Sequence, residues 1–86
     1  MYHPSPNVVF TELDEAESVL LHLKTRQYFS LNETGTLIWK NLQEGKSVGE
    51  IAAAVEQAYE VDGPLALHQV EAFLESLSED RLVEKA

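Results

Sequence analysis

Histidine is the residue in this chain with the broadest chemical repertoire, because an imidazole can bind a metal ion or carry a proton at neutral pH. His3, His22 and His68 are far apart in the sequence. None lies four residues from another and none belongs to an HExxH pattern, so their spacing does not match a zinc site. There are no cysteines, which excludes thiolate ligands, thiol nucleophiles and disulfides. We therefore expect surface or rim histidines and no metal or cofactor.

Carboxylates are abundant, and Glu71, Glu75 and Glu79 recur every four residues. On a helix this spacing makes an acidic ridge, which either keeps the surface solvated or steers a basic partner. The glycines are isolated, so no phosphate-binding loop is present. With no nucleophile, acid/base pair or cofactor motif, the sequence predicts a protein that is not an enzyme.

Six Lys and Arg face fifteen Asp and Glu, giving a net charge of −9. The negative electrostatic field of such a charge repels phosphate backbones and anionic membranes. The N-terminus lacks a basic segment followed by an apolar run, and no apolar stretch reaches the ~20 residues of a membrane helix. These features predict a cytoplasmic protein that binds neither nucleic acid nor membrane.

Short β-branched and aromatic runs predict strands at 8–13, 18–23 and 28–31. Short connections between them favour an antiparallel meander. Pro4 and Pro6 lack backbone donors, so residues 1–6 are expected to form a flexible arm before a single domain at 7–86.

Asn32 is a good N-cap for a first helix through residue 42, which Gly45 would end with a positive φ. The buried stripe of that helix would hold Leu37, Ile38 and Leu42, with Trp39 at its edge. A capping box of Ser47 and Glu50 predicts the start of a second helix.

The third predicted helix spans roughly 64–78, and a short closing strand would follow at 81–84. Its core stripe would be Val70, Phe73 and Leu77, with Leu67 and Leu74 on a neighbouring stripe. The predicted fold class is α+β and winged helix-turn-helix-like, with a three-stranded antiparallel sheet followed by three helices. Residues 47–60 and 65–80 contain no Lys or Arg, so the DNA-reading use of that shape is not expected.

The ordered pattern resembles the PqqD-like family, also called RiPP recognition elements. It is carried by residues 19–35, by Ile38-Trp39, by 47–51, by 59–62 and by 70–77, so that the resemblance covers about 8–84. The chain departs from the pattern in the turn before Tyr28, where Gln27 follows Arg26 and the glycine common in relatives is missing.

The resemblance implies a stand-alone, non-catalytic domain that binds the leader of a ribosomally synthesised precursor peptide and delivers it to a processing enzyme such as a leader peptidase. The Leu31-Asn32 pair and the small size favour the lasso peptide pathway. In this family the leader adds as an antiparallel strand beside the third predicted strand, against the third helix. The peptide-binding residues expected from this arrangement are Lys24, Arg26, Tyr28, Phe29, Ser30, Leu31, Leu67, Val70, Glu71 and Leu74.

Other interpretations of these residues stay open. Leu67 and Leu74 fit ordinary core packing, Tyr28 fits an exposed aromatic, and Lys24 and Arg26 fit a soluble turn. An alternative function is an acidic winged-helix adaptor that docks on another protein through the third helix. The expected protein is a monomer.

Overall fold

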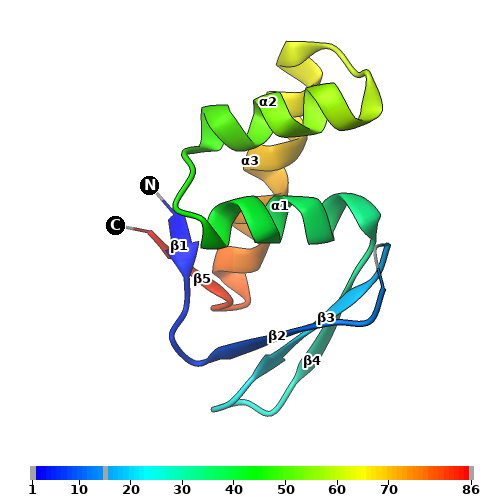
Figure 1. The fold of residues 1–86 in the computed structure, drawn as a ribbon. Helices are drawn as coiled ribbons and strands as arrows, with labels where there is room; N and C mark the ends of the chain where they lie inside the picture. The colour runs from blue at the N-terminus through cyan, green and yellow to red at the C-terminus, as the bar shows by residue number, and fades with distance from the viewer. Residues whose placement is uncertain (1, 15, 86) are drawn as a thin grey trace.

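The central sheet has three antiparallel strands, which three helices follow in the sequence (Figure 1). The computed structural model describes residues 2–14 and 16–85. In it β2 (Val8–Glu12), β3 (Ser18–His22) and β4 (Tyr28–Leu31) form the sheet in the order β2-β3-β4. The helices are α1 (Glu33–Gln43), α2 (Val48–Tyr59) and α3 (Gly63–Glu79). The predicted α+β fold class is confirmed.

The helices lie on one side of the sheet (Figure 1). Because successive side chains of a strand point to opposite sides of a sheet, alternate residues of each strand face the helices. Phe10, Leu20 and Phe29 are directly opposite one another in the register and lie on the side that faces the helices. Leu20 is completely buried. The core is built from the sheet, all three helices and the C-terminal segment, and comprises Leu20, Leu31, Ile38, Trp39, Leu42, Ile51, Ala52, Val55, Ala66, Val70, Leu74, Leu77, Leu82 and Val83.

Local signals fix where the helices begin. The side chain of Asn32 accepts a hydrogen bond from the backbone N–H of Gly35 at 2.9 Å. Ser47 and Glu50 form the predicted capping box, and Asp62 caps α3, a role that the sequence analysis had not assigned. Gly45 has the predicted positive φ, at 82°. Each cap satisfies amides that have no partner inside the helix.

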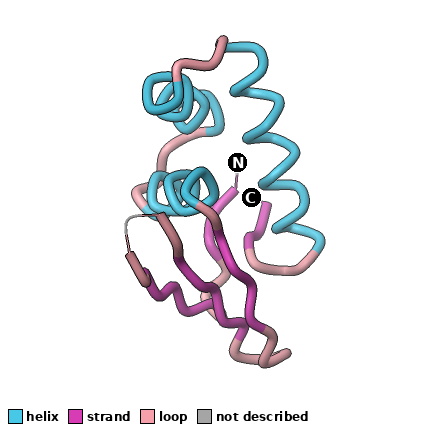
Figure 2. Tube along the Cα trace, turned by 90° about the vertical axis from the view of Figure 1, so that its right-hand side faces the viewer, coloured by secondary structure: helices cyan, strands magenta, loops and turns pink. Residues whose placement is uncertain are grey.

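A second, two-stranded sheet joins the two ends of the chain (Figure 2). It pairs β1 (Tyr2–Pro4) with β5 (Val83–Lys85), and Ser5 donates its backbone N–H to the carbonyl of Leu82 at 3.0 Å. This pairing differs from the flexible arm expected for residues 1–6. An edge strand tolerates proline, so Pro4 does not prevent it.

Two expectations about helix faces are wrong. Trp39 does not lie at the edge of the α1 stripe: its side chain is buried and stacks on Phe10 with ring centroids 6.4 Å apart. Leu74 does not lie beside the α3 core stripe: it lies in the core, and Phe73 is only partly buried. The packing of α1 and α3 against the rest of the fold decided both outcomes.

Candidate functional site

Two outer edges of the central sheet, on β2 and on β4, are unpaired by any described segment, and β4 is the strand that shares a hollow with α3. The candidate edge is therefore that of β4. Its inner edge pairs with β3, and no other described segment pairs with the outer one. An unpaired edge offers rows of amides and carbonyls to another extended chain.

The hydrogen-bond pattern identifies which groups of β4 are free. His22 donates its backbone N–H to the carbonyl of Gln27 at 3.0 Å. In an antiparallel ladder the direction of these groups alternates from residue to residue. Residues 27, 29 and 31 therefore face β3, and the N–H and C=O of Tyr28 and Ser30 face the open edge.

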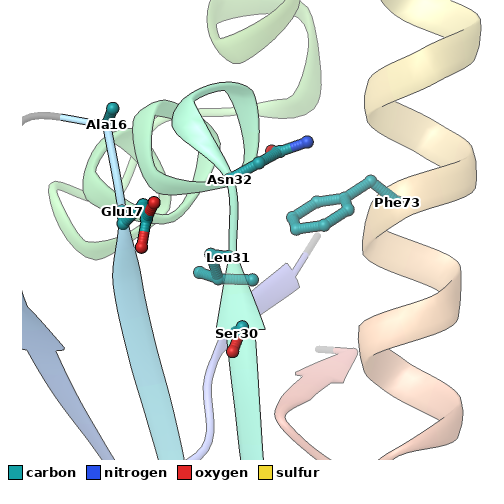
Figure 3. Close-up of a pocket in the computed structure, with 6 residues that line it drawn as sticks. All are labelled: Ala16, Glu17, Ser30, Leu31, Asn32 and Phe73. Atoms are coloured by element: carbon teal, nitrogen blue, oxygen red, sulfur yellow. The ribbon is translucent and has the colours of Figure 1, made fainter.

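A hollow of about 470 Å³ lies at the end of β4 (Figure 3). Ala16 and Glu17, which directly precede β3, bound it on one side, and the ring of Phe73 on α3 bounds it on the other, over a floor that includes Leu31. A second hollow, of about 260 Å³, lies between α1 and α3 and shares Asn32 and Phe73 with the first. The β4–α3 groove, as we call the open edge and these two hollows, is lined by Ala16, Glu17, Ser30, Leu31, Asn32, Thr34, Gly35, Ile38, Gln69 and Phe73.

The groove is apolar near its centre and charged only at its margins. Glu17 is the single charged residue that lines either hollow within the described chain. At the other end of β4 the preceding turn carries Lys24 and Arg26, both exposed. A guest chain along β4 would therefore meet a negative charge at one end and positive charges at the other.

The turn before β4 holds its shape without glycine. Arg26 adopts a left-handed conformation with φ of 60° and donates its backbone N–H to the carbonyl of His22 at 2.7 Å. His22 is buried, and its Nδ1 atom accepts the backbone N–H of Lys24 at 3.2 Å. It is therefore a structural residue of the turn and not a surface histidine, which corrects the expectation for this position.

On β4, the predicted binding residues are divided between the two sides of the sheet. Tyr28 is 73% exposed and, with Ser30, lies on the side away from the helices. Phe29 and Leu31 lie on the side of the core, where Leu31 is buried. Ser30 and Leu31 both line the first hollow.

On α3, none of the predicted residues lines a hollow of the groove. Val70 and Leu74 are completely buried, so their side chains are not exposed to a guest peptide. At about 100° per residue, Leu67 and Glu71 lie roughly 120–160° around the helix from Phe73, and neither lines a groove hollow.

The residues of α3 that do line the groove are not among those predicted from the sequence. Gln69 and Phe73 are one turn apart and face it together. Asn32 was expected as a helix cap and as part of the Leu31-Asn32 pair but not as a binding residue, and its side-chain nitrogen points towards α3 (Figure 3). Helical periodicity places Gln69 and Phe73 on one face of α3. The sequence does not show that this face lies towards the groove.

No group of three or more metal-ligating side chains occurs in the described part of the chain. None of its helices is long and apolar enough to cross a membrane. His3 and His68 are both exposed; His3 lies 3.8 Å from Glu84 across the β1–β5 ribbon.

This fold and groove define an α+β domain with an open strand edge beside a helix. The chain belongs to the PqqD family: residues 17–83 match the model described as coenzyme PQQ synthesis protein D. The resemblance drawn from the sequence is thereby confirmed. A search of curated proteins finds no match.

Two solved structures are similar over nearly the whole chain. One is described as "TbiB1 in Complex with the TbiA(beta) Leader Peptide". It is 39% identical, has a TM-score of 0.92, and the match covers 98% of this chain and 96% of that one. The other is described as "Lasso peptide synthetase B1 complexed with the leader peptide", with 27% identity, a TM-score of 0.88 and 98% of both chains covered.

Proposed function

We propose that this protein is a non-catalytic recognition domain of lasso peptide biosynthesis. It binds the leader segment of a ribosomally synthesised precursor peptide by strand addition to β4 and delivers it to a processing enzyme. The observation that carries the proposal is the outer edge of β4, which pairs with no described segment and whose end, at Ser30 and Leu31, lines a hollow together with Phe73. Family membership and the two similar leader-bound proteins support it.

Backbone pairing alone gives modest affinity. Tyr28 and Ser30 offer two N–H and two C=O groups, and each net hydrogen bond contributes about 0.5–1.5 kcal/mol. Burial of leader side chains in the groove adds to this at about 25 cal/mol per Å² of apolar area. An apolar leader residue against Leu31 and Phe73 would therefore supply much of the affinity and the specificity.

The direction of the guest sets its charge pattern. An antiparallel guest begins near Leu31 and ends beside Tyr28, because β4 runs from Tyr28 to Leu31. Its N-terminal end then lies near Glu17 and its C-terminal end near Lys24 and Arg26. We expect a basic or hydrogen-bond-donating residue before the paired segment and an acidic residue after it.

The direct test is a calorimetric titration of the domain with a synthetic peptide that carries the leader sequence of the precursor encoded beside it. A scrambled peptide of the same composition is the control. Saturable binding of the leader alone is expected, whereas no saturable binding below ~1 mM would overturn the proposal.

A second peptide series tests strand addition itself. Methylation of leader backbone nitrogens, one at a time, should abolish binding only at alternate residues, because alternate N–H groups point to β4 and to α3. A series without this alternation would contradict pairing with β4.

A further inference from the structure

A third hollow, of about 290 Å³, lies outside the β4–α3 groove and shares no lining residue with the two hollows of that groove. Four parts of the chain meet there: the segment that follows β1, the end of β3 with its turn, the end of α3, and β5. β5 follows α3 and pairs with β1 (Figure 1). Of the residues around this hollow, the proposed function uses only Lys24.

The donor hollow, as we call it, is lined by hydrogen-bond donors that include Ser5, His22, Lys24, Thr25, Ser78 and Arg81. Lysine and arginine side chains donate hydrogen bonds and accept none, and hydroxyl and imidazole groups donate as well. A set of donors that includes two cations is suited to the oxygens of an anion.

The ring of His22 is held so that one nitrogen is fixed as a donor. Its Nδ1 atom accepts the backbone N–H groups of Lys24 and Thr25 at 3.2 and 3.4 Å. Because an imidazole that accepts at Nδ1 carries its proton at Nε2, the Nε2–H group is a donor. Trp39 Nε1 is the one fully buried side-chain nitrogen or oxygen without a partner in the described chain. Nε2 of His22 therefore reaches open space, and the donor hollow is the space that His22 lines.

The pairing of the two chain ends positions a second buried donor. Ser5 directly follows β1, and its backbone N–H is bonded to the carbonyl of Leu82 at 3.0 Å. Its Oγ atom accepts the backbone N–H of Asn7 at 3.2 Å, so the hydroxyl proton is left to donate. Ser5 is 7% and His22 4% exposed, so both donors belong to the rigid interior and not to mobile surface side chains.

Lys24 and Arg81 make the donor hollow positive within an acidic chain. Neither belongs to an ion pair among the described residues. Glu84 is the only carboxylate that lines the hollow, and it lies 3.8 Å from His3 on the adjacent strand. Two cations against one carboxylate favour an anion. Because the whole chain has a net charge of −9, a singly charged carboxylate is repelled less than a doubly charged phosphate.

We propose that the donor hollow binds a carboxylate group. Arg81 and Lys24 supply the positive charge, and the buried His22 and Ser5 supply hydrogen bonds of fixed direction. Two sources offer this chemistry: a free small carboxylate, and an acidic side chain of the guest peptide beyond its paired segment, whose C-terminal end lies near Lys24. Only the second source rests on the proposed function.

An NMR titration with sodium acetate tests the site, with the ring signals of His22 followed at constant pH and ionic strength. We expect saturable shifts in wild type, and an affinity that is roughly fivefold lower or less in Arg81→Gln because a charge-assisted hydrogen bond is lost. Lys85→Gln is the matched control, since it removes one positive charge from β5 at an exposed residue that does not line the hollow. It should bind acetate nearly like wild type.

Three results would overturn the carboxylate site. They are the absence of saturable shifts up to about 100 mM acetate, equal losses in Arg81→Gln and Lys85→Gln, and tighter binding of inorganic phosphate than of acetate. Lys24→Gln repeats the test should circular dichroism show that Arg81→Gln is unfolded.

A competition experiment identifies the source of the carboxylate. If leader peptide prevents the acetate shifts, and exchange of the acidic leader residues after the paired segment for their amides restores them, the leader supplies the group. If leader peptide binds in calorimetry and acetate still shifts His22, the site serves a free carboxylate. A leader peptide that does not bind at all would overturn the proposed function, whereas the acetate result on the domain alone would stand.

Discussion

A Cβ atom on Gly35 would lie 3.1 Å from Cζ of Phe73, which is closer than ordinary van der Waals contact. The same Cβ would lie 3.3 Å from Oδ1 of Asn32 and 3.4 Å from Cβ of Leu31. The missing side chain of Gly35 therefore lets the aromatic wall of the groove approach the start of α1. Gly35 is the glycine of the family pattern, so this position of the pattern affects the shape of the site.

Gly35→Ala should lower leader affinity several-fold with little loss of stability. The new methyl group displaces the Phe73 ring towards the groove, while alanine favours the helix over glycine by about 0.5–1 kcal/mol. Calorimetry and thermal unfolding measure the two effects. An unchanged affinity would mean that the ring moves away from the guest or does not contact it.

Ser30→Pro should weaken leader binding at least tenfold by removing an N–H that points to the open edge. Proline is tolerated on an edge strand at such a position because no bond to β3 is lost. Ser30→Ala keeps the N–H and removes the hydroxyl, so it is the matched control and should bind nearly like wild type. Equal losses in both variants, measured by titration, would indicate that the side chain is recognised instead of the backbone.

Phe73→Ala and Leu74→Ala should have opposite consequences although the residues are adjacent. Leu74 is completely buried, and its truncation should cost about 2–5 kcal/mol of the free energy of unfolding. Phe73 is partly buried and lines both groove hollows, so its truncation should mainly reduce leader affinity. Urea unfolding and titration of both variants separate the effects; a Phe73→Ala variant with wild-type affinity would remove Phe73 from the binding surface.

Local chemistry made much of the fold predictable. Asn32, Gly45 and the capping box of Ser47 and Glu50 act within one helical turn, so the sequence is sufficient to identify them. The pairing of β1 with β5 was not predictable in this way, because it joins residues at opposite ends of the chain. Nothing near Tyr2–Pro4 indicates its partner.

The candidate site was predictable on β4 but not on α3. The strand positions Tyr28 to Leu31 follow from alternation and from the family pattern. On α3, apolar residues occupy several adjacent angular positions, so periodicity permitted more than one buried stripe. Packing against the rest of the fold selected Val70, Leu74 and Leu77 for the core and left Gln69 and Phe73 facing the groove.

The cap of α2 should make stability depend on acid pH through Glu50. The pKa of Glu50 is lowered from 4.5, first because the backbone N–H of Ser47 donates to its carboxylate and second because of its side-chain hydrogen bond with Ser47. A carboxylate with a lowered pKa in the folded state adds stability that is fully present above 4.5. That contribution is lost as pH falls below 4.5 and through the lowered pKa.

Urea unfolding of wild type and Glu50→Gln should therefore differ most at neutral pH and converge as the carboxylate is protonated. Glu56→Gln removes one negative charge from the same helix without touching the cap, so it corrects for the change in net charge. The predicted signature is a destabilisation of Glu50→Gln, relative to Glu56→Gln, that disappears in acid. Parallel curves for the two variants at every pH would show that the cap gains nothing from the ionised form, and that the hydrogen bond to Ser47 is equally strong with a neutral side chain.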